Sequence, residues 1–328
     1  MIIFFLIVLI ILIFFLQQWT LENGIDAVDG NYWPEENIVD PGEAFNLTVE
    51  LKNLTRLPLY FLKVQYEGLD GKTSALSTWV KPLQKVQLRF SVLANERGRY
   101  LLKRPTVACG DFLGLKETKK ELEQYREVVV APEPYSTQDV KQTLGKFLGD
   151  YSVRRFIHED PILTVGFREY TGREPMKMIS WKQSAQKQQL MVKEFDHTVE
   201  PVLSILVNIE TDSDITKAEF EKCFSIARTV CANLEAKGIS YDFYTNALMA
   251  GGTGTDYSVN EGIGSRHFLK ILEFLGRSTY SASFSAEKLL EMADEHGGKE
   301  RGKIIITPST FPLTSIDGQF LILRSTQL

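Results

Sequence analysis

A run of oxygen-bearing side chains, NIETDSD at residues 208–214, offers the most concentrated chemistry in this sequence. It directly follows the apolar run VLSILV, whose continuous hydrophobic character is typical of a buried parallel strand. Ligands of α/β folds bind at the carboxyl ends of parallel strands, and carboxylates and hydroxyls are good ligands for Mg²⁺ or Ca²⁺. Glu210, Asp212 and Ser213 are therefore candidate cation ligands.

Helix capping is a simpler explanation for part of the same run. Asp212 and Ser213 come just before a predicted helix, where acidic and hydroxyl side chains accept hydrogen bonds from free N–H groups and complement the helix dipole. We favour capping and expect no metal or other cofactor. A Mg²⁺ or Ca²⁺ site completed by Thr253 or Thr255, from the glycine-rich segment 251–264, is the alternative.

No arrangement of catalytic residues accompanies this run. The sequence contains neither a G-x-S-x-G elbow nor a G-x-x-x-x-G-K-S/T phosphate loop. Four histidines are scattered without the spacing of metal ligands: His158, His197, His267 and His296. Three cysteines are too few for a disulfide framework, and we expect Cys109, Cys223 and Cys231 to be buried thiols in a reducing compartment. The chain is therefore predicted not to be an enzyme.

A second candidate site is the segment 166–196, which is rich in aromatic and charged residues. Its basic residues are partly balanced by acidic ones, so it is not a simple cationic patch. Arg168, Tyr170 and Trp181 are residue types that anchor protein interfaces, because a planar guanidinium and rigid rings lose few rotamers on binding. A tryptophan next to a core strand is more often buried. We favour a structural role for the segment, with partner contact as the alternative.

The N-terminal sixteen residues, MIIFFLIVLIILIFFL, are entirely apolar and favour lipid over water. A cleaved signal peptide would have a basic start and a small-residue cleavage site, and neither is present. We predict a single-pass transmembrane anchor at residues 1–19, a location in the cell membrane and the lipid bilayer as a partner. The acidic flank after the anchor favours the outer side. The cysteines favour the cytoplasm, where we place the rest of the chain.

Three further regions follow the predicted anchor. Residues 38–133 show short alternating runs between turns, which predicts a small β-sandwich of immunoglobulin-like type. Residues 201–328 alternate apolar strands with helices, which predicts an α/β domain with a mostly parallel sheet. The region between them, residues 134–200, contains a linker and the segment 166–196.

Two of these regions contain well-specified elements. Phe45, Leu47, Val49 and Leu51 alternate with polar residues, so one face of their strand should be buried. In the C-terminal region, apolar residues recur at helical spacing between Thr216 and Gly238. Thr216 and Glu219 form a capping box at the start of this predicted helix, and Gly238 is suited to its C-terminus.

The segment from Arg168 to Phe195 contains REY, I-x-W-K-x-S-A and L-M-V-K-E-F. This pattern resembles the signature of the "domain of unknown function 58" family of bacterial proteins. The upstream run RGRYLLKRPTVACGDFLGL is similar to the region before that signature. The signature residues, which we expect to contact partners, are Arg168, Glu169, Tyr170, Trp181, Lys182 and Ser184.

The resemblance implies a fold class and partners. The C-terminal α/β domain would be von Willebrand factor A-like, behind the sandwich and the transmembrane helix. The family is often encoded beside MoxR-type AAA+ ATPases and other membrane proteins, which are the expected partners. Many A-type domains bind a cation through D-x-S-x-S, whereas this chain has Asn208, Glu210 and Asp212 in those positions. An amide is a weaker ligand for a hard cation than a carboxylate, so we expect a degenerate site.

We therefore predict a non-enzymatic, membrane-anchored adaptor or chaperone partner. It would work with a MoxR-type AAA+ ATPase in assembling or maintaining cell-envelope or other protein complexes. The alternative function is a cation-dependent receptor for a protein ligand, using the degenerate site. Nucleic acid is excluded as a partner because the net charge of the chain is −5.

Overall fold

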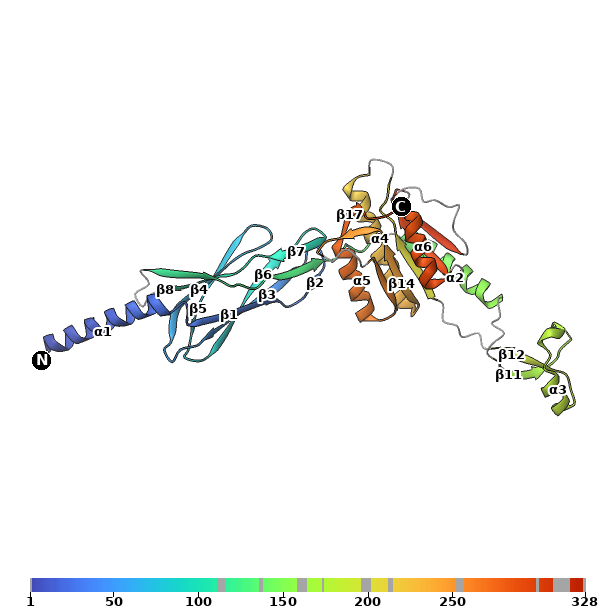
Figure 1. The fold of residues 1–328 in the computed structure, drawn as a ribbon, viewed down its shortest axis with the longest axis horizontal. Coiled ribbons are helices and arrows are strands. Elements are labelled where there is room, and N and C mark those ends of the chain that lie inside the picture. Colours follow the sequence, from blue (N-terminus) through green and yellow to red (C-terminus); the bar gives the residue numbers. More distant parts are fainter. Residues whose placement is uncertain are drawn as a thin grey trace. The chain divides into compact units, whose positions relative to one another are not determined.

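The computed structural model assigns the chain to two compact units (Figure 1). Unit 1 comprises residues 1–133, 249–254 and 269–279, and unit 2 comprises residues 134–248, 255–268 and 280–328. The structure describes residues 2–110, 116–135, 138–157, 164–172, 174–195, 202–211, 215–251, 257–298, 301–308 and 319–326.

One helix and ten strands are found in the described residues of the N-terminal part of unit 1. They are α1 (Ile2–Asn23), β1 (Val28–Pro34), β2 (Ile38–Val39), β3 (Ala44–Asn53), β4 (Leu59–Glu67), β5 (Thr73–Val80), β6 (Lys85–Leu93), β7 (Gly98–Leu102), β8 (Thr106–Gly110), β9 (Glu117–Glu121) and β10 (Arg126–Val130). The strands form three sheets, in the orders β1-β3-β6, β2-β10-β7 and β5-β4-β8-β9.

The sheets of unit 1 enclose one hydrophobic core. The alternation predicted for β3 is confirmed, because Phe45, Leu47, Val49 and Leu51 are all buried. Leu47 lies opposite Phe90 of β6 in the antiparallel register, and such cross-strand pairs stabilise a sheet. Leu62, Val64 and Tyr66 of β4 belong to the same core. Each of these sheets therefore contributes one face to this core.

The remaining elements are α2 (Gln138–Ile157), β11 (Thr164–Glu169), the 3₁₀ helix η1 (Met176–Met178), α3 (Trp181–Lys187), β12 (Met191–Phe195), β13 (Val202–Val207), α4 (Lys217–Lys237), β14 (Ser240–Thr245), β15 (Ala247–Met249), β16 (Ser258–Gly262), α5 (Ser265–Arg277), β17 (Ser278–Ala282), α6 (Ala286–Gly297), β18 (Gly302–Thr307) and β19 (Phe320–Arg324). β11 pairs with β12, and β15 pairs with β17. A five-stranded sheet has the order β16-β14-β13-β18-β19.

Both faces of the central strands β13 and β18 are buried. Consecutive residues of β13, from Leu203 to Val207, have almost no exposure. One face packs against α6, since Leu206 and Ile305 share a hydrophobic cluster with Leu289. Helix α4 also contacts these strands. The continuous apolar run of β13 predicted this two-sided burial, and β13 pairs in parallel with β14 and β18 as expected.

Helix α4 is specified by its own sequence. The predicted capping box is present, with the Glu219 carboxylate accepting a hydrogen bond of 3.0 Å from the backbone N–H of Thr216. Gly238 ends the helix at φ 68°, a left-handed conformation that favours glycine. Between these ends, a stripe of buried side chains includes Phe224 and Cys231. All three features agree with the prediction.

The predicted fold class is wrong for the chain. We expected a von Willebrand factor A-like, mostly parallel sheet behind a sandwich and a transmembrane helix. Among the described strands, parallel pairing occurs only between β2 and β10 and within the five-stranded sheet, and the fold is mixed α/β with many antiparallel sheets. The physical reason is that short alternating strands joined by turns pair antiparallel, and such strands make up most of unit 1.

The predicted membrane anchor is also wrong. None of the helices in the described ranges has the length and apolar character needed to cross a bilayer. The sixteen apolar residues extend about 24 Å at 1.5 Å per residue, short of a hydrocarbon layer of about 30 Å. Polar residues such as Gln17 and Glu22 continue α1 instead of completing an apolar span. The single-pass anchor at residues 1–19, and the location assigned from it, are therefore not supported.

Lys303 of β18 gives a test of the buried core of unit 2. Its side chain is 1% exposed, and its ammonium lies 2.9 Å from the Asp294 carboxylate of α6. We expect Asp294→Asn to lower the free energy of unfolding by about 2 kcal/mol, because it leaves a buried charge without its counter-charge. Lys303→Met, which removes the charge and keeps the volume, should cost less than Asp294→Asn. Urea denaturation of both variants checks this order, and a larger loss for Lys303→Met would contradict it.

Candidate functional site

The segment with the family-like pattern forms a two-stranded hairpin and a short helix within unit 2, residues 164–195, here called the signature module. β11 and β12 pair antiparallel, with Phe167 opposite Lys193 and Arg168 opposite Val192 (Figure 1). Ile179, after η1, forms a further bridge to Val192. Val192 and Ile179 are buried, so they form the apolar centre around which the hairpin and α3 assemble.

A tight turn follows β11 and is closed by Glu174. Its carboxylate lies 2.6 Å from the Arg168 guanidinium, accepts a 2.7 Å hydrogen bond from the Thr171 hydroxyl and accepts another of 3.1 Å from the Thr171 N–H. Gly172, at φ 86°, supplies the left-handed residue that the turn requires. The Thr171 hydroxyl and the Arg168 guanidinium hold the pKa of Glu174 at about 2, well below its ordinary range.

Ser184 has an internal role. Its hydroxyl donates a 2.8 Å hydrogen bond to the carbonyl of Ser180 and accepts one of 2.8 Å from the N–H of Met191. The carbonyl of Met191 in turn accepts a hydrogen bond from the N–H of Ser180. Ser184 is buried and thereby ties α3 to β12. Its hydroxyl is therefore used within the module, where it positions α3 against β12.

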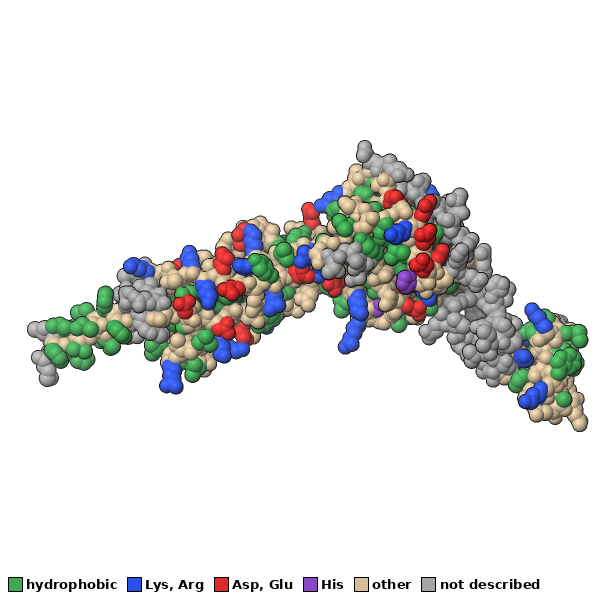
Figure 2. Space-filling model, viewed as in Figure 1, with side chains coloured by type: hydrophobic (Ala, Val, Ile, Leu, Met, Phe, Trp, Pro, Cys, Tyr) green, Lys and Arg blue, Asp and Glu red, His purple; other side chains and the backbone are tan. Residues whose placement is uncertain are grey.

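The other signature residues lie at or near the surface. Trp181, the first residue of α3, is 62% exposed. The prediction that this tryptophan is buried is therefore wrong. Lys182 and Glu169 are exposed and Tyr170 is half-buried. Further large apolar side chains are exposed around them: Phe167, Met176 and Leu190. Figure 2 shows hydrophobic and basic side chains together on the surface of this module.

The candidate cation site in the run 208–214, at the carboxyl ends of the parallel strands, is occupied by a network of side-chain amides. The side-chain N–H of Asn208 donates to the Thr307 hydroxyl at 3.1 Å, and the side-chain N–H of Asn246 donates to the Asn208 carbonyl at 2.6 Å. The side-chain carbonyl of Asn246 accepts a 2.9 Å hydrogen bond from the N–H of Ile209. These bonds join the ends of β13, β14 and β18, so Asn208 serves the fold.

Glu210 serves as a helix cap. Its carboxylate accepts a 2.6 Å hydrogen bond from the N–H of Ala286, the first residue of α6. The other proposed ligands, Asp212, Ser213, Thr253 and Thr255, lie outside the described residues. Within the described part of the chain, no group of three or more His, Cys, Asp or Glu side chains is arranged to hold a metal ion. Capping therefore accounts for the one carboxylate of this run that the structure describes.

The cysteines agree with the sequence-based expectation of buried thiols. Cys109, Cys223 and Cys231 are free and buried. Burial raises the pKa of the Cys109 and Cys223 thiols to about 11, so both stay protonated near neutral pH. A protonated, buried thiol is a poor nucleophile, and these residues are packing groups.

The sequence matches no family model and no curated protein. Solved structures that resemble parts of the chain include the CARDB domain of the PF1109 protein from Pyrococcus furiosus, which is 20% identical, covers 32% of this chain and 90% of that chain, and has a TM-score of 0.24. The sporulation control protein Spo0M from Bacillus subtilis is 12% identical over 44% of this chain and 58% of that chain, with a TM-score of 0.19. At such low TM-scores these likenesses carry no argument about function, and the family resemblance stays a prediction.

The turn around Glu174 generates a pH prediction. In the folded protein its carboxyl should titrate near pH 2, and Thr171→Val should raise this pKa more than Arg168→Met, because the Thr171 hydroxyl is the larger cause of the shift. The stabilisation of the turn is fully present above the ordinary Glu pKa and is lost as the pH falls towards about 2. A carboxyl-detected NMR titration checks this, and a midpoint near the ordinary value of a free Glu would contradict the ion-paired turn.

Proposed function

We propose that this protein is a non-enzymatic adaptor that binds a MoxR-type AAA+ ATPase through its signature module, in the assembly or maintenance of protein complexes. The observation that carries the proposal is the exposure of Trp181 together with Met176 and Leu190 on one small, ordered module. Large apolar side chains gathered on a surface mark sites of protein contact. Tryptophan is also among the residues most often found at the energetic centre of interfaces.

The charges of the module favour an acidic partner segment. Between residues 166 and 195 the sequence has six Lys or Arg residues and three Glu residues. Lys177, Lys182 and Lys187 of the module are exposed. A basic surface of this kind attracts an acidic partner over a Debye length and raises the association rate. The partner surface should therefore combine carboxylates with apolar residues that cover Trp181.

The internal hydrogen bonds of the module support a pre-organised surface. Ser184 fixes α3 against β12, and Glu174 closes the turn after β11. A surface that is already ordered loses less conformational entropy when it binds. The residues of the module then have two roles: Glu174 and Ser184 shape the module, and Trp181 and Lys182 contact the partner.

The experiment is co-purification of the full chain with a MoxR-type AAA+ ATPase, followed by calorimetry of the two proteins. We expect Trp181→Ala to weaken binding at least tenfold, and Lys182→Ala to weaken it less and to reduce its dependence on salt. Both side chains are exposed, so neither variant should change the melting temperature appreciably.

Ile263→Ala is the matched control, because Ile263 is a similarly exposed apolar residue outside the module. This variant should bind as the parent does. Unchanged binding by Trp181→Ala would refute docking through the module. Loss of binding that follows a loss of stability would show that Trp181 acts through the fold.

A further inference from the structure

In the described part of the chain, one face of the four-stranded sheet β5-β4-β8-β9 is exposed, since most residues of β5 and β9 are exposed. Leu62, Val64 and Tyr66 of β4 point into the core of unit 1. The intervening residues of β4 therefore lie on the opposite side, here called the outer face. On the neighbouring strands the register places Ala75 and Thr106 beside Gln65. Small side chains beside long polar ones leave this part of the outer face hollowed.

Three aromatic residues lie at one end of the outer face. The register of β4 and β5 shifts between Leu59 and Leu62, and this irregularity lies opposite Trp79. Tyr60 and Trp79 are 50% and 53% exposed, with ring planes 16° apart and centroids 6.5 Å apart. Phe61 is also half exposed and lies over Gly110, where a Cβ would come within 3.0 Å of the Cβ of Phe61.

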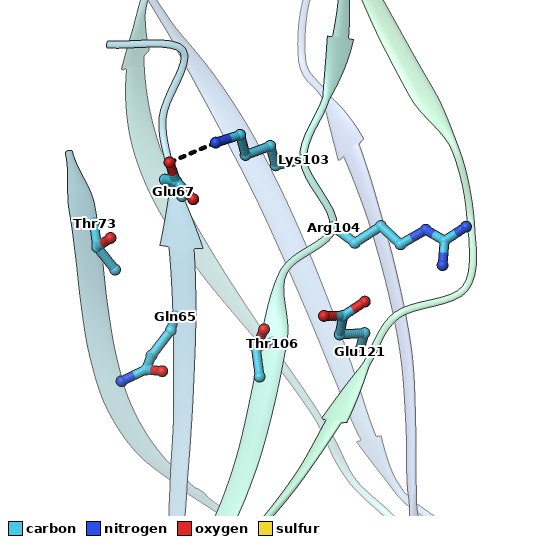
Figure 3. A pocket seen from close by; sticks show the side chains of 7 residues that line it. All are labelled: Gln65, Glu67, Thr73, Lys103, Arg104, Thr106 and Glu121. Carbon is cyan, nitrogen blue, oxygen red and sulfur yellow. Dashed lines mark hydrogen bonds and ion pairs between the residues drawn. The ribbon is translucent and has the colours of Figure 1, made fainter. Parts of the chain in front are cut away.

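The other end of the outer face holds a polar hollow of about 400 Å³ (Figure 3). Its lining residues come from four strands and the loop before β8: Gln65, Glu67, Thr73, Lys103, Arg104, Thr106 and Glu121. Figure 3 shows Lys103 reaching across the hollow to Glu67, with which it forms an ion pair. Arg104 extends away from Lys103 and stacks over Tyr125 at 4.0 Å. Hydroxyl, amide, carboxylate and ammonium groups thus line one open site.

We propose that the outer face of this sheet binds a neutral oligosaccharide. Near-parallel, exposed rings such as Tyr60 and Trp79 present apolar surface that suits the C–H face of a sugar ring. The hollow supplies donors and acceptors for sugar hydroxyls, which both donate and accept hydrogen bonds. Gln65 lies five positions after Tyr60 along β4, or about 16 Å at about 3.3 Å per residue. A short oligosaccharide covers that distance, whereas a single sugar does not.

The balance of charge in the hollow favours a neutral ligand. Its two carboxylates, Glu67 and Glu121, offset its two cations, Lys103 and Arg104. A nucleic acid strand would need a positively charged groove along its backbone, which this balance does not provide. An acidic peptide would meet the same two carboxylates. A polyhydroxyl ligand can form hydrogen bonds with carboxylates, ammonium groups and amides alike, without requiring a net charge.

The test is calorimetric titration of the full chain with four defined probes: maltohexaose, cellohexaose, xylohexaose and chitohexaose. We expect at least one probe to bind with a Kd tighter than about 1 mM. Trp79→Ala should weaken that binding at least tenfold, and Trp79→Phe, which keeps an aromatic ring, should retain most of it. Gln65→Ala should weaken binding severalfold through lost hydrogen bonds in the hollow.

Leu101→Ala is the control, because Leu101 is an exposed apolar residue of β7, in a different sheet of unit 1. It should leave the affinity unchanged, and thermal denaturation checks that every variant is folded. Absence of binding by all four probes would overturn the proposal, as would binding that Trp79→Ala leaves intact. Loss of ATPase binding in Trp79→Ala, without any sugar binding, would assign the outer face to protein contact instead.

Discussion

The burial of β13 and β18 on both faces is the constraint on which unit 2 depends. A polar group in such strands cannot reach water, so it must find a partner inside the protein. Lys303 is paired with Asp294, and Asp242 of β14 is paired with Arg301 at 2.6 Å. Burial raises the pKa of Asp242, although the Arg301 guanidinium acts to lower it. Lys303 and Asp242 are therefore each balanced by a counter-charge within the protein.

The same constraint explains why the most oxygen-rich run of the sequence serves the fold. Asn208 lies where β13 ends and is 1% exposed, so its amide must be satisfied internally. It is satisfied by Thr307 and Asn246 at the ends of the neighbouring strands. Glu210, just beyond, satisfies an N–H at the start of α6. Polar residues at the carboxyl edge of a parallel sheet can thus stabilise strand ends and helix starts with no ligand involved.

In elements that are not buried on both faces, large apolar side chains lie at the surface. A two-stranded hairpin with one short helix has little interior, and the signature module buries only a few residues such as Val192 and Ile179. Trp181 is left outside for that reason. The antiparallel sheet of unit 1 likewise buries one face, which leaves Trp79 and the polar hollow exposed. Both proposed binding surfaces therefore arise because the module and this sheet cannot bury all of their large side chains.

The sequence by itself determined the elements whose signals are local. The capping box of α4 and its terminal Gly238 depend on contacts within a few residues, and the alternation of β3 and the apolar run of β13 depend only on burial. Tertiary structure alone decided the features that depend on distant partners. These are the exposure of Trp181, the hydrogen bond from Asn246 to Asn208 and the mixture of parallel and antiparallel sheets. The type of a residue fixes which interactions it can make, whereas only the packing of distant segments fixes which neighbours are available to make them.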